Sequence, residues 1–231
     1  MIKDNIEYVQ SEMKKACEKS NRDINDVKLI CVSKTKPVSD IQEAYDAGAR
    51  DFGENKVQEL MDKIDKLPDD IRWHLIGHLQ TNKVKYVVGK VFMIHSVDSL
   101  KLAAAIDKES EKKNVITDIL LEVNISGEES KFGLKPEKLS EVVSEIEKLE
   151  HVNLKGFMTV PPIINDSSDN SVYFKRLKDL SVDIMGKKTD NNCGIELSMG
   201  MSDDYRTAIE CGATYVRVGS FIFGARDYSK L

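Results

Sequence analysis

The sequence predicts an α/β protein of the (β/α)8 TIM barrel class, with one extra helix before the first strand. Short runs rich in Val and Ile alternate with amphipathic stretches along the 231 residues, which is the pattern of βαβ units and of a parallel sheet. Eight such strands are the number that closes into a barrel. An open doubly wound sheet is the alternative, but no G-x-G-x-x-G follows the first strand.

The elements follow from the apolar spacing. The extra helix, residues 2–20, is indicated by apolar residues at helical spacing before Asn21, namely Ile2, Ile6, Val9, Met13 and Ala16. Strands are predicted at residues 27–32, 51–52, 73–76, 91–95, 116–123, 154–158, 194–197 and 214–218. Helices are predicted between these strands at residues 39–46, 56–67, 81–88, 99–113, 136–149, 172–185 and 204–211.

Turn residues support these boundaries. Gly48 and Gly212 stand where helices end, Pro136 suits the first turn of a helix, and Ser202 suits a helix N-cap. A long loop is predicted only at residues 161–170, the segment PPIINDSSDN. We expect residues 1–231 to form one domain, because no shift in composition marks a second one.

Composition excludes several function classes. The chain carries 34 Lys and Arg against 39 Asp and Glu, a net charge of -5, and no basic run, so nucleic acid is not expected as a partner. The sequence contains no run of about 18 apolar residues and no secretory leader. We therefore expect a cytoplasmic protein that does not span a membrane. The four cysteines form no C-x-x-C and the four histidines no H-E-x-x-H, so no metal site or redox pair is expected. His74 and His78 are interpreted as packing histidines or as histidines whose hydrogen bonds are satisfied within the protein.

Lys34 is the first candidate site residue, because it follows the apolar run LICVS and precedes the strand-stopping Pro37. Functional side chains of a barrel gather at the carboxyl ends of its strands. Burial there, with Lys36 as a neighbouring positive charge, is expected to lower the pKa of the Lys34 amine below about 10.4 and to expose a nucleophile able to form a Schiff base. The structural alternative is a lysine that extends from a strand end into solvent.

Two turns predict a phosphate site. The segment LSMGMSDDY places Ser198, Gly200 and Ser202 in alternation before a helix. Amides at a helix start, a hydroxyl and a glycine that permits close approach form a cradle for an anion. Gly219 and Ser220 follow the eighth strand, and barrels of this class bind phosphate in the loops after strands seven and eight. Ordinary strand-to-helix turns with a serine cap are the alternative.

Arg217 lies two residues before Gly219, on the same face of the strand. A guanidinium inside a barrel needs an acceptor, because burying an unpaired charge is costly. We consider two acceptors, a heteroaromatic nitrogen of a ligand and the carboxylate of Glu196. Asn55, in the turn FGEN, is placed to hydrogen-bond a phenolic or carbonyl oxygen of the same ligand, whereas Glu54 is interpreted as a cap of the following helix.

Six segments, in this order and spacing, resemble the pyridoxal phosphate (PLP) homeostasis proteins, a family of PLP-binding single barrels of alanine-racemase-like fold, PLP fold type III. They are CVSKTKP, FGENKVQE, WHLIGHLQTNKVK, VNISGEESKFGL, GFMTV and LSMGMSDDYRTAIECGATYVRVGSFIFGAR. The resemblance covers nearly the whole chain. The cofactor-binding residues that it implies are Lys34, Asn55, Ser198, Gly200, Arg217, Gly219 and Ser220. Among them Lys34 holds PLP as an internal aldimine, Arg217 faces the pyridine nitrogen, Asn55 lies near the ring, and the others bind the phosphate.

The resemblance implies a PLP carrier that captures the cofactor reversibly, passes it on, and has no strong catalytic activity. An arginine beside the ring nitrogen is permanently charged and only a donor, so it keeps this nitrogen unprotonated and weakens carbanion stabilisation. We also expect no room after the barrel for the β-domain that completes racemases of this fold, and hence a monomer with PLP-dependent apo-enzymes as acceptors. A single-domain racemase-like enzyme is the alternative, and a sugar-phosphate-binding barrel is a third.

Overall fold

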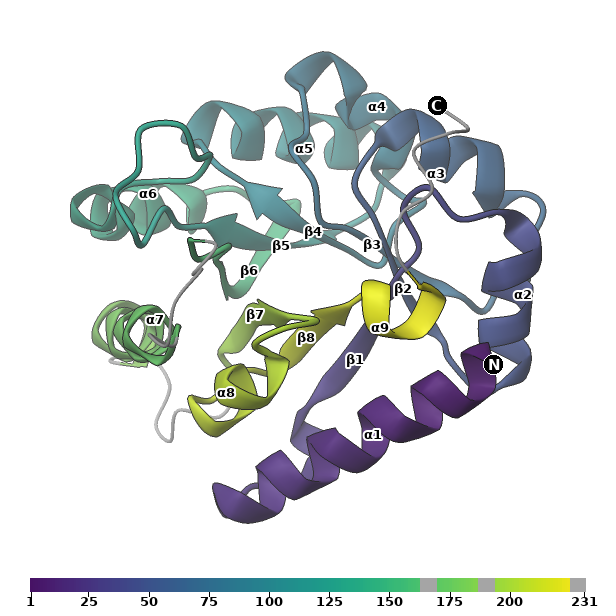
Figure 1. Ribbon diagram of the computed structural model, residues 1–231. Coiled ribbons are helices and arrows are strands. Elements are labelled where there is room, and N and C mark those ends of the chain that lie inside the picture. Colours follow the sequence, from purple (N-terminus) through teal and green to yellow (C-terminus); the bar gives the residue numbers. More distant parts are fainter. Residues whose placement is uncertain (163–169, 187–193, 225–231) are drawn as a thin grey trace.

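The computed structural model describes residues 1–162, 170–186 and 194–224, which form a closed barrel of parallel strands with helices around it (Figure 1). Each strand pairs with the next along the chain, and the last pairs with the first. The strands are β1 Lys28–Val32, β2 Asp51–Glu54, β3 Arg72–Leu75, β4 Met93–Val97, β5 Thr117–Glu122, β6 Val152–Met158, β7 Glu196–Met201 and β8 Tyr215–Val218. The predicted barrel is confirmed, and the open sheet is excluded.

The helices lie outside the strands, as predicted, and α1 precedes the first strand (Figure 1). Their bounds are α1 Ile2–Lys19, α2 Val38–Asp46, α3 Val57–Ile64, α4 Val84–Val87, α5 Leu100–Lys113, α6 Leu139–Ile146, α7 Ser171–Met185, α8 Tyr205–Glu210 and α9 Ser220–Phe223. Short 3-10 turns are η1 Ile24–Asp26, η2 Thr81–Lys83 and η3 Pro136–Lys138. The sequence did not predict α9, because one helical turn is too short to show an apolar repeat.

Alternation along the strands divides the core into two parts. One set of apolar side chains faces the surrounding helices, and the other fills the barrel interior. The interior set comprises Ile30, Val32, Met93, Leu120, Met158 and Tyr215. Polar side chains share this interior and are also buried: Asp51, His74, His95, Ser198 and Arg217. The barrel is thus filled by both apolar and polar groups.

Helix ends follow the predicted turn chemistry with one exception. Gly48 and Gly212 follow α2 and α8 with φ of 100° and 104°, values that favour glycine, and Pro136 begins η3. Ser202 is not the N-cap of α8, because the helix starts later and Asp204 occupies that position. The Ser202 hydroxyl instead accepts a hydrogen bond from the amide of Gly219 at 3.3 Å.

The short helix α9 lies beside α1, close to the end of β8 (Figure 1). Asn5 of α1 donates its side-chain amide to the carbonyl of Ile222 at 2.9 Å. Lys36 donates to the carbonyl of Phe223 at 2.7 Å and so satisfies an acceptor at the end of α9. These contacts join the first helix to the residues that follow the last strand.

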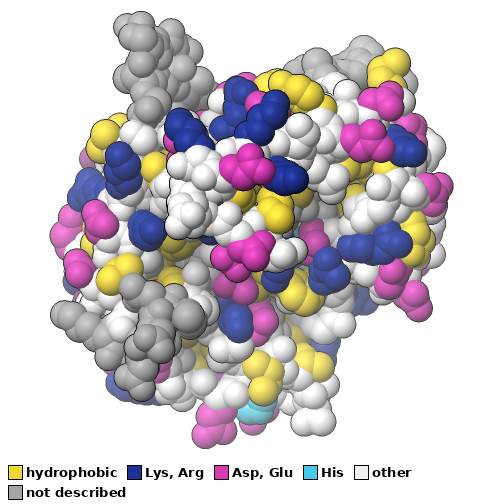
Figure 2. Space-filling model, turned by 90° about the horizontal axis from the view of Figure 1, so that it is seen from below, with side chains coloured by type: hydrophobic (Ala, Val, Ile, Leu, Met, Phe, Trp, Pro, Cys, Tyr) yellow, Lys and Arg dark blue, Asp and Glu magenta, His cyan; other side chains and the backbone are white. Residues whose placement is uncertain are grey.

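The surface of the described residues shows no extended patch of one charge on the face in Figure 2, where Lys and Arg alternate with Asp and Glu. Within the same residues, no helix is long and apolar enough to cross a bilayer, and no cluster of His, Cys, Asp and Glu suits a metal ion. Most of the predicted loop at 161–170 lies outside the described residues, as does Cys193.

Candidate functional site at the barrel mouth

The seam between β1 and β8 brings the predicted anchor lysine close to the predicted phosphate turn. Cys31 pairs with Val218, so Gly219 lies beside Val32, two residues before Lys34. A Cβ on Gly219 would lie 3.2 Å from the Val32 carbonyl oxygen, which is a tight contact. The glycine therefore permits the close approach of the two chain segments, and residues from opposite ends of the sequence meet at the mouth.

The turn that carries Lys34 is held from below by a buried ion pair. The ammonium of Lys63 donates to Glu54 Oε1 at 2.7 Å and to the carbonyl of Ser33 at 2.9 Å. The Ser33 hydroxyl donates to the same Glu54 oxygen at 2.7 Å. Thr35 follows Lys34 with φ 64°, a left-handed conformation uncommon outside glycine. Glu54 was interpreted as a helix cap, but the structure shows that it fixes the Lys34 turn.

Burial controls the charge state of this ion pair. The side chain of Glu54 is fully buried and that of Lys63 is 8% exposed. Burial raises the pKa of Glu54 above its ordinary value, and the nearby Lys63 ammonium only partly opposes this effect. Glu54 Oε2 has no hydrogen-bond partner among the described residues. A carboxylate in such surroundings depends strongly on the Lys63 ammonium that it contacts.

Arg217 is almost fully buried and reaches across β7 towards the end of β6. It donates from Nη1 to Ser198 Oγ at 2.6 Å and from Nη2 to the carbonyl of Thr159 at 2.9 Å. Burial lowers its pKa to about 10, against the opposing effect of the Asp204 and Glu122 carboxylates, so it stays charged at neutral pH. The alternative acceptor considered above, Glu196, is not its hydrogen-bond partner.

Ser198 and Ser202 have different surroundings. Ser198 is fully buried, and its hydroxyl contacts Arg217 and lies 2.9 Å from His95 Nδ1. Ser202 stands beside the Gly219 amide at the mouth. Between them Gly200 has φ 88°, and a Cβ there would lie 2.5 Å from the Cβ of Ala208. The carboxyl end of β7 therefore needs glycine to pack against α8.

Asn55 and Gly77 lie together on the opposite side of the mouth. A Cβ on Gly77 would lie 2.4 Å from the Asn55 carbonyl oxygen, so glycine is required for this contact. Asn55 Oδ1 is buried and has no hydrogen-bond partner among the described residues. Since buried polar atoms are nearly always satisfied in native proteins, this atom is suited to a ligand.

A carboxyl group that sequence reasoning missed also points into the mouth. Glu122 ends β5 and is 8% exposed. Burial raises its pKa to about 7, with Arg217 opposing the shift and Asp98 adding to it. The inward position of Glu122 follows from alternation along β5, but its proximity to Arg217 depends on the register of the whole barrel.

The loop after β5 borders the mouth and is internally ordered. The Asn124 side chain donates to the carbonyl of Glu128 at 2.8 Å and accepts from the amide of Gly127 at 3.0 Å. His78 stacks on Phe132 with ring centroids 4.1 Å apart and pairs with Asp98 at 3.1 Å. The two loops that follow β3 and β5 are thereby joined.

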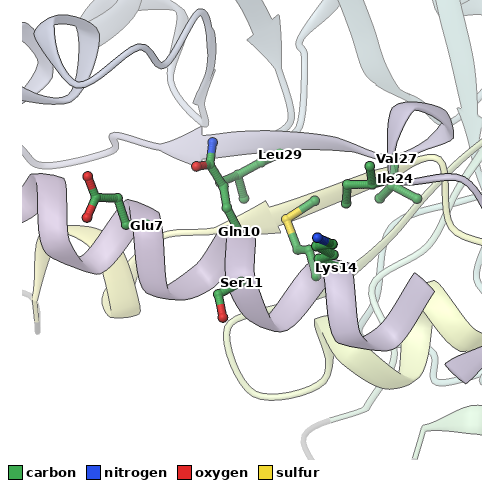
Figure 3. Close-up of a pocket in the computed structure, with 8 residues that line it drawn as sticks. Glu7, Gln10, Ser11, Lys14, Ile24, Val27 and Leu29 are labelled. Atoms are coloured by element: carbon green, nitrogen blue, oxygen red, sulfur yellow. The ribbon is translucent and has the colours of Figure 1, made fainter. Parts of the chain in front are cut away.

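Two surface hollows lie away from these residues. One, of about 530 Å³, runs between α1, η1 and the start of β1, where Figure 3 shows Glu7, Gln10 and Lys14 on the helix side. The other, of about 570 Å³, lies at the amino ends of β1, β7 and β8 beside Lys28, Glu196 and other side chains. Neither contains a predicted site residue, so the mouth is the candidate site.

The fold and this site define a barrel of the alanine racemase class. The family model described as alanine racemase, N-terminal domain, matches residues 3–227. A pyridoxal phosphate homeostasis protein of Aquifex aeolicus is 44% identical over 96% of this chain and 97% of its own length. Its counterpart in Escherichia coli is 37% identical over 99% of this chain and 98% of its own length. The chain belongs to the pyridoxal phosphate homeostasis protein family.

Solved structures agree with this assignment. PipY of Synechococcus elongatus with PLP bound is 32% identical, with a TM-score of 0.83 over 97% of this chain and 100% of its own. Alanine racemase of Clostridium difficile superposes with a TM-score of 0.74 at 15% identity, over 99% of this chain and 58% of its own. The second likeness shows the fold alone.

Proposed function

We propose that this protein binds PLP at the barrel mouth through Lys34 and acts as a reversible PLP carrier. The observation that carries the proposal is the β1–β8 seam, which brings the Lys34 turn beside Gly219 and the buried Arg217 beneath the mouth. To bind PLP, a site needs an amine for the aldehyde, an amide-rich turn for the phosphate and a hydrogen-bond partner for the pyridine nitrogen. PLP carries all three groups, and PipY is described with PLP bound.

The residues present fit this cofactor. Asn55 Oδ1 is a buried polar atom with no partner among the described residues. Arg217 has N–H groups beyond the two hydrogen bonds that hold it. The amides of Ser220 and of the turn around Gly200 are suited to the phosphate, with Gly219 allowing close approach. Ser198 remains a predicted phosphate ligand, although its hydroxyl already contacts Arg217.

The chemistry at Lys34 is capture and release. The Lys34 amine would hold the PLP aldehyde carbon through a C=N bond, with loss of water on capture and uptake of water, or exchange with another amine, on release. Arg217 donates to the pyridine nitrogen and keeps it unprotonated, so the bound cofactor is a weak electron sink. These residues favour holding the aldehyde over transforming an amino acid.

An absorption spectrum with added PLP, before and after borohydride reduction, tests the proposal. We expect a new band and a reduced adduct that maps by mass to the peptide containing Lys34. Lys34→Ala should abolish both, whereas Lys36→Ala, the matched control, should retain them. An unmodified protein, or an adduct at another lysine, would overturn the proposal. Loss of chirality of an L-amino acid above the Lys34→Ala background would instead support the racemase-like alternative.

We further propose that the carrier is a single domain, residues 1–231, that works as a cytoplasmic monomer and delivers PLP to PLP-dependent apo-enzymes. Light scattering of the purified protein tests the monomer. Recovery of activity by an apo-aminotransferase, mixed with the PLP-loaded protein under conditions in which free PLP is trapped, tests delivery. A dimer in light scattering would contradict the monomer, and an apo-enzyme that recovers no activity would contradict delivery of PLP.

A further inference from the structure

The barrel interior contains a row of polar side chains that the proposed carrier role does not use. Asp51, His74 and His95 come from the successive strands β2, β3 and β4, and Ser198 comes from β7 across the barrel. The two histidines and Ser198 are fully buried, and Asp51 is 7% exposed. Most buried polar groups in native proteins are hydrogen-bonded, so the partners of these four side chains need to be identified.

Their hydrogen bonds are continuous from one end of the barrel to the other. Asp51 Oδ1 lies 3.0 Å from His74 Nε2, and His74 Nδ1 lies 2.9 Å from His95 Nε2. His95 Nδ1 lies 2.9 Å from Ser198 Oγ, which accepts from Arg217 Nη1 at 2.6 Å. At the outer end, Arg72 donates to both carboxylate oxygens of Asp51 at 2.8 and 2.6 Å.

The histidine rings are held by aromatic neighbours as well. The ring of Tyr215 lies 5.5 Å from that of His74 and 5.4 Å from that of His95, measured between centroids. The ring of Phe92 lies 5.4 Å from that of His74. Rotation of either imidazole would require these rings to move, so the pairing of nitrogen atoms is defined by packing.

The charge states of the chain members follow from their surroundings. Burial tends to raise the pKa of Asp51, but the hydrogen bonds from Arg72 and His74 outweigh it and hold the pKa at about 2. Burial lowers the pKa of His74, against the opposing effect of Asp51, and lowers that of His95 well below its ordinary value. At neutral pH the chain therefore contains one carboxylate and two neutral imidazoles.

The proton on each atom can then be assigned. Asp51 accepts, so His74 carries its proton on Nε2 and accepts at Nδ1. His95 must donate from Nε2 to His74, which leaves its Nδ1 as an acceptor for the Ser198 hydroxyl. Ser198 Oγ in turn accepts from Arg217. In the reversed direction, Ser198 would receive two hydrogens, and its own would find no acceptor among the described residues.

We infer that Asp51, His74, His95 and Ser198 form a directed hydrogen-bond chain that positions the Arg217 guanidinium at the barrel mouth. Its orientation is set by a carboxylate at the opposite end of the barrel. Asp51, His74 and His95 are positioning residues, because they act through Ser198 and Arg217. The part of the inference that concerns the cofactor rests on the proposed function, in which Arg217 faces the pyridine nitrogen.

The first test uses the protein without PLP and reads the imidazole tautomers directly. Two-bond proton–nitrogen NMR of 15N-histidine-labelled protein at pH 7 should show His74 and His95 as neutral, each protonated only at Nε2. Asp51 Oδ1 accepts from both Arg72 Nε and His74 Nε2. In Asp51→Asn the negative charge is lost and this atom becomes an amide oxygen or an NH2 group, so the two rings should no longer be held in the Nε2–H form alone. Asp118→Asn is the matched control on β5, because Asp118 pairs with Asn153 outside the chain. Mixed tautomers in the wild type, or unchanged ones in Asp51→Asn, would overturn the inference.

The second test uses the PLP-loaded protein and asks whether the chain acts through Arg217. Ser198→Ala should move the pH midpoint of the bound PLP absorption by about one pH unit, and Ser198→Thr, which keeps the hydroxyl, should restore it. Ser198→Ala also serves if Asp51→Asn does not fold. An unchanged midpoint would refute the positioning role. Absence of any PLP band in the wild type would refute the proposed function and leave the tautomer result to decide the chain.

Discussion

Lys63→Met tests the ion pair beneath the Lys34 turn. Lys63 is the cation that contacts the fully buried Glu54 carboxylate, at 2.7 Å, so its removal leaves Glu54 without a charged partner in the core. Breaking a buried pair from one side costs about 3–5 kcal/mol. We therefore expect the free energy of unfolding in urea at pH 8 to fall by about that amount. Lys66→Met, an exposed control three residues further along the chain, should change it by less than about 0.5 kcal/mol.

The pH dependence sharpens this prediction. Burial raises the pKa of Glu54 in the folded protein, and loss of Lys63 removes the cation that opposes the shift. Folded Lys63→Met then retains a proton on Glu54 that the unfolded chain releases above about pH 4.3. Stability of the variant consequently falls as the pH rises, and its deficit should be smaller at pH 5 than at pH 8.

A second substitution separates loss of charge balance from loss of packing. Glu54→Gln in the Lys63→Met background removes the uncompensated charge and should recover about 2 kcal/mol, a coupling typical of residues in contact. A cost below about 1 kcal/mol for Lys63→Met would match an exposed ion pair and would refute the reasoning. A double variant no more stable than Lys63→Met would do the same.

Three further predictions concern the mouth. Lys34→Ala should lose the PLP adduct yet melt within a few degrees of the wild type, because a strand-end amine contributes little packing; a collapsed fold in circular dichroism would contradict this. Ser198→Ala removes one of the two hydrogen bonds that hold Arg217 and should thereby weaken PLP retention, measured by equilibrium dialysis, by about 1–3 kcal/mol. Ser96→Ala, which also loses a buried hydroxyl, should not. The pKa of Glu122 is raised to about 7 in the folded state, so its contribution to stability is lost as the pH rises from about 4.3 to 7. Glu122→Gln should flatten the plot of unfolding free energy in urea against pH over that range. An unchanged plot would contradict the raised pKa of Glu122.

The sequence was sufficient for the barrel because its elements are short, regular and separated by turn residues with defined conformations. Gly48 and Gly212 ended helices as predicted, and the β/α alternation gave the strand order. The end of the seventh strand was less predictable. There β7 continues to Met201, and Asp204 rather than Ser202 begins the helix. Both Asp and Ser suit an N-cap, so local chemistry did not distinguish them.

The site was less accessible from sequence wherever two strands contribute to one contact. Lys34 and Arg217 were recognised because each is unusual at the end of an apolar run. His95 and Ser198 belong to strands on opposite sides of the barrel, and nothing local to either segment indicates that they touch. Glu54 was assigned to a helix cap for the same reason, since its partner Lys63 lies on the far end of α3. Whether two such residues come into contact depends on the register of the strands and on closure of the barrel.

The seam between β1 and β8 has a consequence for the order of events during synthesis. Lys34 emerges from the ribosome well before Arg217, Gly219 and Ser220, and the contact between α1 and Ile222 also waits for the later segment. A nascent chain that has not yet reached Ser220 lacks one half of the mouth. A ligand that bridges the seam therefore stabilises only the finished barrel, and its binding reports that the ring of strands has closed.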